Sequence, residues 1–181
     1  MNSPSPEPAA RRLFLALWPD ATTRDALAAL AQRVAGAAAT PAANLHLTLV
    51  FFGTTPAARE AAYRSVLAGL SAPALDLTLD RLGWWARSRT LFAAPSQPPA
   101  ALETLLAALL ARLVPCGFTP ENRPFRPHVT LARRKAADAA TDAALPPLAW
   151  RTERIVLAES VSGPAGSRYL PRAAWPVDGT R

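Results

Sequence analysis

The sequence of 181 residues predicts one domain of the α+β class, or one domain made of two small lobes with a boundary near residues 95–99. Segments typical of strands and helices follow one another in the order βαβαββαβββ. Two of the helical segments carry an apolar stripe along one side. A four-residue pattern that begins with histidine recurs in two strand segments far apart in the chain, which indicates a duplicated strand.

Seven segments are rich in strand formers or alternate apolar with polar residues. They cover residues 12–17, 45–52, 75–82, 90–94, 128–132, 150–160 and 168–175. Gly53 closes the second segment, and residues 83–88 are expected to form the turn between the third and the fourth. In the third segment, Leu75, Leu77 and Leu79 alternate with polar residues, so we expect a half-buried strand there.

Three segments are predicted to be helices. Asp20 is placed to cap the first, residues 21–34. Pro56 takes the favoured first position of the second, which extends to about residue 70. The third covers residues 100–114, and its stripe consists of leucines: Leu102, Leu105, Leu106, Leu109 and Leu113. Two loops and an expected helical turn complete the chain; they are residues 36–43, 115–127 and 136–144.

We expect residues 1–11 to form a flexible N-terminal segment and residues 12–181 to form a single domain. The N-terminal segment does not have the features of a signal peptide. Residues 34–58 carry no formal charge, but prolines, glycines and polar residues interrupt them, which excludes a membrane span. The single cysteine, Cys116, cannot form an intramolecular disulfide. These features predict a soluble, cytoplasmic protein with no membrane partner, and we expect a monomer.

The net charge of +7 gives only weak support for a nucleic-acid partner, because just one of the 20 cationic residues is lysine. Arginine, alanine and proline are enriched together, as in a biased genome. Charge alone therefore does not decide the partner.

Both histidines of the chain open the same pattern, His46-Leu47-Thr48-Leu49 and His128-Val129-Thr130-Leu131. Chance would produce this coincidence about once in ten thousand such sequences. Side chains alternate across a strand, so each histidine shares a face with its threonine while the apolar residues point to the core. A single histidine in an apolar strand is usually a core residue, but a repeated histidine–threonine pair favours a functional site.

Two such pairs suit the cleavage of a phosphodiester. Histidine can be neutral or protonated near neutral pH, so one copy can accept a proton while the other donates one. Threonine hydroxyls can donate hydrogen bonds to the non-bridging phosphate oxygens. This chemistry requires no metal and no cofactor.

Competing sites fit the sequence less well. A catalytic zinc site would have to recruit carboxylates that the repeated pattern does not supply. A nucleophilic pair of Cys116 with a histidine stays open, but it would leave the repeated threonines unexplained. The glycine motifs GxxxxGK[ST] and GxGxxG are absent from the sequence, so an ATP or dinucleotide site has no motif to support it.

The segments NLHLTLVFFG (44–53) and RPFRPHVTLAR (123–133) resemble the two HxTx signatures of the RNA 2′,3′-cyclic phosphodiesterases. This group is also called the 2′-5′ RNA ligase family and lies within the two-histidine phosphoesterase superfamily. The resemblance extends over nearly the whole chain. This chain has Ala42-Ala43 where the family usually has Pro-Glu, and Thr90 and Phe92 where valine and tryptophan are common.

The resemblance implies a bilobal fold of two pseudo-symmetric βαβαβ-like halves, with antiparallel sheets lining a central cleft. It implies His46 as the proton donor to the leaving ribose oxygen and His128 as the base that activates water. The expected activity is opening of a terminal RNA 2′,3′-cyclic phosphate to a 2′-phosphomonoester, on RNA ends or small cyclic-phosphate nucleotides. The alternatives are 2′-5′ RNA ligation by the reverse chemistry and a non-catalytic RNA-binding module.

Three further residues are candidates for substrate binding. Arg126 and Arg133 flank the second motif, and guanidinium groups suit phosphate. Phe51 can stack a nucleobase, as can Phe14 and Tyr169, although packing in the core is the ordinary role of each. Arg134 and Lys135 are expected to be solvated.

Overall fold

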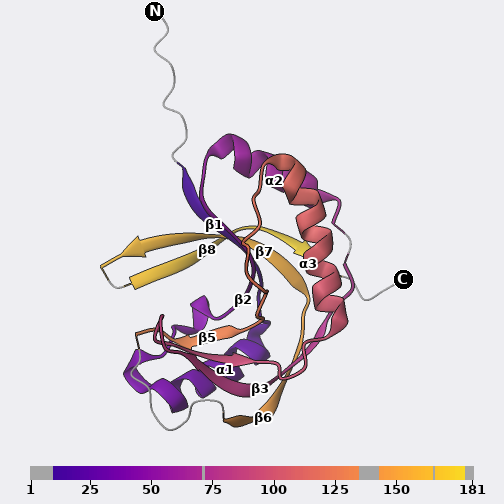
Figure 1. Ribbon diagram of the computed structural model, residues 1–181. Coiled ribbons are helices and arrows are strands. Elements are labelled where there is room, and N and C mark those ends of the chain that lie inside the picture. The colour runs from indigo at the N-terminus through magenta and orange to yellow at the C-terminus, as the bar shows by residue number, and fades with distance from the viewer. Residues whose placement is uncertain (1–9, 71, 135–142, 165, 178–181) are drawn as a thin grey trace, which may run out of the picture.

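The computed structural model describes residues 10–70, 72–134, 143–164 and 166–177 (Figure 1). It contains three α-helices: α1 (Ala21–Ala35), α2 (Ala57–Ala68) and α3 (Ala100–Leu113). Short 3-10 helices lie at η1 (Gly36–Ala38), η2 (Ala42–Asn44) and η3 (Val114–Cys116). The strands are β1 (Arg11–Leu17), β2 (Leu47–Thr55), β3 (Asp76–Trp85), β4 (Thr90–Ala94), β5 (Val129–Ala132), β6 (Ala144–Arg151), β7 (Arg154–Gly163) and β8 (Gly166–Pro176).

The strands form one eight-stranded sheet in the order β6-β3-β4-β5-β2-β1-β7-β8, and their pairings are antiparallel. The predicted α+β class is confirmed. The two central strands, β2 and β5, meet at the single pair Leu47 and Val129, which divides the sheet into two sets of four strands. The division into two pseudo-symmetric lobes stays a prediction. The predicted boundary between a flexible segment and the domain at residue 12 also stays a prediction, because residues 1–9 lie outside the described part.

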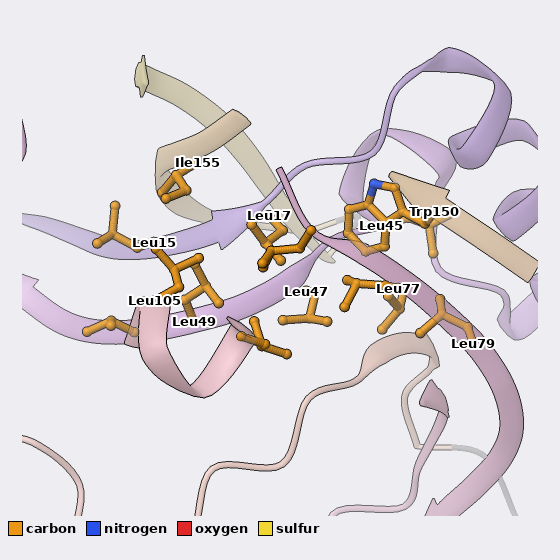
Figure 2. Close-up of a cluster of buried hydrophobic side chains, with 14 of the residues drawn as sticks. Leu15, Leu17, Leu45, Leu47, Leu49, Leu77, Leu79, Leu105, Trp150 and Ile155 are labelled. Atoms are coloured by element: carbon orange, nitrogen blue, oxygen red, sulfur yellow. The ribbon is translucent and has the colours of Figure 1, made fainter. Parts of the chain in front are cut away.

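One face of the sheet packs against the helices and forms the main core. Leu15 of β1, Leu47 and Leu49 of β2, and Leu77 of β3 are buried there, and Leu105 of α3 lies beside them in Figure 2. The opposite face carries a second cluster, which consists of Phe14, Ala16, Val156 and Ala158 with Trp18 and Tyr169 against it. Because side chains alternate along each strand, residues between the core positions belong to this second face.

Local sequence signals predicted α1 well. The Asp20 carboxylate accepts a hydrogen bond from the Thr23 backbone N–H at 2.9 Å and from the Thr23 hydroxyl at 2.6 Å, which confirms the N-cap. In α2, by contrast, Pro56 is the N-cap residue and the helix ends at Ala68, before the predicted limit. The stripe of α3 is buried except at Leu106, which is half-buried.

The turn predicted at residues 83–88 begins later than expected, and the prediction is wrong for residues 83–85, because β3 continues to Trp85. Gly83 pairs with Phe92 of β4, and its missing side chain makes room for that aromatic ring. Gly53 likewise does not end β2. The strand passes through it with a positive φ of 70° and shifts register beside β1 between Leu13 and Phe14.

The C-terminal strands differ most from the prediction. The expected strand over residues 150–160 is two strands, and β6 pairs with β3 at one edge of the sheet. This strand contains Pro146 and Pro147, which an edge strand tolerates although proline cannot donate a hydrogen bond to a neighbouring strand. Most of the helical turn predicted at residues 136–144 lies outside the described residues, and Ala144 already belongs to β6. No helix in the described ranges is long and apolar enough to cross a bilayer.

Candidate active site

The register of β2 and β5 brings the two repeated motifs together at the centre of the sheet. Leu47 pairs with Val129, and both side chains are fully buried in the core. Continued by one residue on each side, this antiparallel register sets His46 opposite Thr130 and Thr48 opposite His128. Both histidines directly precede the assigned strands. The four polar residues thus share the face away from the core, arranged about a local two-fold axis.

Each imidazole is held in the same way. Nδ1 of His46 lies 2.7 Å from the carbonyl oxygen of Asn44, and Nδ1 of His128 lies 2.7 Å from that of Arg126. A carbonyl oxygen can only accept, so Nδ1 carries the hydrogen in both rings. Nε2 is therefore the nitrogen that exchanges a proton, and at His46 it accepts a hydrogen bond from the Thr48 hydroxyl at 3.0 Å.

Aromatic rings surround both histidines. His46 contacts Phe14 at 4.8 Å between ring centroids, Tyr169 at 5.0 Å and Trp18 at 5.5 Å. His128 contacts Trp85 at 4.5 Å and Phe92 at 5.7 Å. These rings remove water from the imidazoles, which are both half-buried.

The pKa of His46 is lowered from 6.5 to about 4, chiefly by burial and in smaller part by the charges of His128 and Arg133, against the hydrogen bond to Asn44, which raises it. Burial also lowers the pKa of His128, together with the charges of Arg133 and Arg123 and against the hydrogen bond to Arg126. Both imidazoles are therefore neutral at pH 7 in the unliganded protein. A bound anion would favour the protonated form of either imidazole.

The three residues predicted to bind substrate, Arg133, Arg126 and Phe51, lie in different segments around the two histidines. Arg133 is exposed just beyond β5, and its charge acts on both histidines. Arg126 holds His128 through its backbone carbonyl, whereas its guanidinium group is exposed. Phe51 is 37% exposed and pairs with Phe14, so it shares the face of the histidines. The guanidinium of Arg12 lies 4.7 Å from the centre of the Phe51 ring.

Glycine at position 83 shapes the wall beside His128. A Cβ atom there would lie 2.3 Å from Cζ of Phe92, the ring that packs on Trp85 at 4.3 Å and on His128.

The substitution Gly83→Ala is expected to displace the Phe92 ring and destabilise the protein by about 1–3 kcal/mol, as overpacking does. Chemical denaturation measures the change in the free energy of unfolding. Gly163→Ala is the matched control, because its Cβ would meet only a carbonyl oxygen at 3.8 Å. Equal stability of the two variants would contradict the prediction.

Comparison with known proteins identifies the family to which this chain belongs. A family model described as the 2′-5′ RNA ligase superfamily matches residues 13–164, which include both motifs. The chain belongs to this superfamily.

Individual relatives of this superfamily member cover most of its length. It is 38% identical over 138 residues to the RNA 2′,3′-cyclic phosphodiesterase of Escherichia coli (strain K12), covering 73% of this chain and 75% of that protein. The crystal structure of E. coli LigT complexed with 3′-AMP matches with a TM-score of 0.81 at 32% identity, over 93% and 98% of the two chains. A protein of Thermus thermophilus matches with a TM-score of 0.79 at 25% identity, over 94% and 100%.

Sequence reasoning did not single out several neighbours of the histidines in this superfamily member. They are Asn44, Trp18, Trp85, Phe92 and Gly83. Asn44 lies inside the first signature segment, two residues before the histidine, which is a signal that could have found it. The aromatic residues come from β3, β4 and the position directly after β1, and no local pattern connects them with a histidine in a distant segment. Among the described residues, no three histidine, cysteine, aspartate or glutamate side chains group closely enough to hold a metal ion.

Proposed function

We propose that this protein is a phosphodiesterase that opens the terminal 2′,3′-cyclic phosphate of RNA to a 2′-phosphomonoester by two-histidine acid–base catalysis. The central observation is that the paired strands β2 and β5 carry one imidazole each at the same place in the sheet, and that Nδ1 of both rings is bound to a backbone carbonyl, which leaves Nε2 for proton exchange. Family membership and the named phosphodiesterase relative support the same reaction. LigT, a structural relative, has been crystallised with 3′-AMP, ATP and NADP+, which supports RNA ends or nucleotides as ligands.

In the proposed reaction, Nε2 of His128 takes a proton from water as the water oxygen bonds to phosphorus. The bond from phosphorus to the ribose 3′ oxygen breaks, and Nε2 of His46 gives its proton to that oxygen. The products are a 2′-phosphomonoester and a free 3′ hydroxyl. The assignment of donor and acceptor follows the family resemblance, since the two sites are alike in their hydrogen bonds to Nδ1.

The threonines are proposed to bind the non-bridging oxygens. In the unliganded protein the Thr48 hydroxyl donates to Nε2 of His46. Once that nitrogen is protonated it no longer accepts, so the hydroxyl becomes free to donate to phosphate. Thr130 stands opposite His46 in the extended register and offers the second donor. Arg133 supplies positive charge from just beyond the C-terminal end of β5, while Arg126 and Phe51 are proposed to contact the rest of the nucleotide.

The decisive experiment is incubation with a short RNA that ends in a 2′,3′-cyclic phosphate, in the presence of a chelator. We expect complete conversion to the 2′-phosphomonoester, identified by chromatography against both phosphate isomers. A 2′-5′ linked product from an added 5′-hydroxyl RNA would favour ligation. Binding without turnover would favour the non-catalytic RNA-binding module.

The rate is expected to have a bell-shaped dependence on pH, with different limbs for kcat/KM and kcat. The limbs of kcat/KM report the free protein, where burial lowers the pKa of both histidines. The bound phosphate favours both imidazolium forms, so both limbs of kcat should lie at higher pH than those of kcat/KM. Rates between about pH 3.5 and 9, a window that includes the lowered pKa of His46 and the usual histidine pKa, test this. A flat profile with chemistry rate-limiting would contradict acid–base catalysis.

A further inference from the structure

The Asn44 side chain connects the first motif to the last strand of the sheet. Its amide nitrogen donates to the carbonyl oxygen of Ser167 at 2.7 Å, and its side-chain oxygen accepts from the backbone N–H of Tyr169 at 3.1 Å. Both partners are backbone groups of β8, which pairs with β7 alone at the edge of the sheet. One carboxamide thus joins segments more than 120 residues apart, since the separations are 123 and 125 residues.

The same residue touches His46 through its backbone. The carbonyl oxygen of Asn44 accepts the Nδ1 hydrogen of His46 at 2.7 Å. Tyr169, whose N–H the side chain holds, places its ring edge-on to His46 at 5.0 Å and edge-on to Phe14 at 5.1 Å. Asn44 therefore contacts the imidazole through its backbone carbonyl and, through its side chain, holds the backbone of the residue whose ring packs against it.

The second motif is built differently. Arg126 occupies the position that corresponds to Asn44, since its carbonyl oxygen accepts from His128. Among the described residues, its exposed side chain makes no hydrogen bond to a neighbouring strand comparable to that of Asn44. The two imidazoles thus have equal hydrogen bonds at Nδ1, but only at His46 is the residue that supplies the carbonyl also bound through its side chain to another strand, among the described residues.

We propose that Asn44 is a positioning residue for His46, and that its carboxamide acts by fastening η2 to β8 so that the Tyr169 ring closes over the imidazole. The proposal rests on the proposed function, in which His46 is the proton donor. A proton donor must present Nε2 to the leaving oxygen in one orientation, and a displacement of 1 Å can reduce a rate by about 10²-fold. A fixed Nδ1–H···O bond in both protonation states provides that orientation.

Asn44→Ala removes both side-chain hydrogen bonds and keeps the backbone carbonyl. We expect kcat to fall by about 10- to 100-fold with KM within about threefold, because binding depends less on the orientation of Nε2 than proton transfer does. We also expect the pKa of His46 to rise toward 6.5, because release of Tyr169 admits water to the ring. The charged groups that act on His46 from the adjoining elements, His128 and Arg133, stay in place.

The titration is measured by NMR without any substrate. The chain has only two histidines, so two imidazole Cε1–H signals are expected, and His46→Asn assigns them. The His46 signal should shift its midpoint upward in Asn44→Ala while the His128 signal titrates as in the parent. Tyr169→Leu, with Asn44 intact, should produce the same shift, and the double variant should add little to either.

Thr152→Val is the matched control, because the buried Thr152 hydroxyl oxygen also accepts a backbone N–H from a distant segment, that of Leu75 at 2.9 Å. Thr152→Val should destabilise the protein about as much as Asn44→Ala does, while both histidine signals titrate as in the parent. The proposal is overturned if the His46 signal of Asn44→Ala titrates as in the parent, if both signals shift equally, or if Asn44→Ala fails to fold while Thr152→Val folds. Absence of turnover in the parent would refute the proposed function, while the titration would still test the role of Asn44.

Discussion

Replacing either histidine is expected to lower kcat on an RNA 2′,3′-cyclic phosphate by about 10²- to 10⁴-fold, the usual contribution of a general acid or base. His46→Ala removes the proposed donor and His128→Ala the proposed acceptor. Neither change touches the main core, because Leu47 and Val129 beside them stay buried. Single-turnover rates at the pH optimum measure the loss, and circular dichroism with thermal unfolding shows whether each variant is folded.

Thr78→Ala is a suitable control, since Thr78 is exposed on β3 outside both motifs. It should retain the parental rate. The double variant His46→Ala/His128→Ala should be little worse than either single variant, because the two groups act in one concerted proton transfer. A folded single variant with a rate within about threefold of the parent, far less than the expected loss, would show that the imidazole it lacks has no catalytic role.

The two threonines should have the next largest effect. Thr48→Val and Thr130→Val keep the shape of the side chain and delete the hydroxyl, so each is expected to lower kcat by about 10- to 10³-fold, approaching the loss of one oxyanion donor. The effect should fall on kcat more than on KM, because the charge on the phosphate oxygens increases in the transition state. Steady-state kinetics on the same cyclic-phosphate RNA separates the two constants.

Serine at each position tests whether the hydroxyl itself is responsible. Thr48→Ser and Thr130→Ser retain a donor and lose only a methyl group, so both should recover most of the rate that valine removes. Valine variants as active as the parent would assign the threonines to the strand alone. Serine variants as slow as the valine variants would show that the packing of the methyl group is what matters.

Local patterns in the sequence predicted the parts of the fold that depend on near neighbours. The Asp20 cap acts on Thr23, three residues away, and the stripe of α3 repeats every three or four residues. The family and the α+β class followed from the repeated motif and the order of segments. The prediction was wrong where a distant partner decides, as at Gly83, whose strand character depends on the Phe92 ring across β4.

In the candidate site, too, local sequence predicted some features and contacts between distant segments decided the others. The two-residue period of a strand set each histidine beside its threonine from the sequence alone, because the alternation of side chains is a property of the backbone. Only the tertiary structure decided that β2 lies next to β5, that Trp18 and Tyr169 cover His46 while Trp85 and Phe92 cover His128, and that Asn44 reaches β8. The lowered pKa of each imidazole arises from that covering, since desolvation depends on which distant segments exclude water from a ring. No local spacing contains that information.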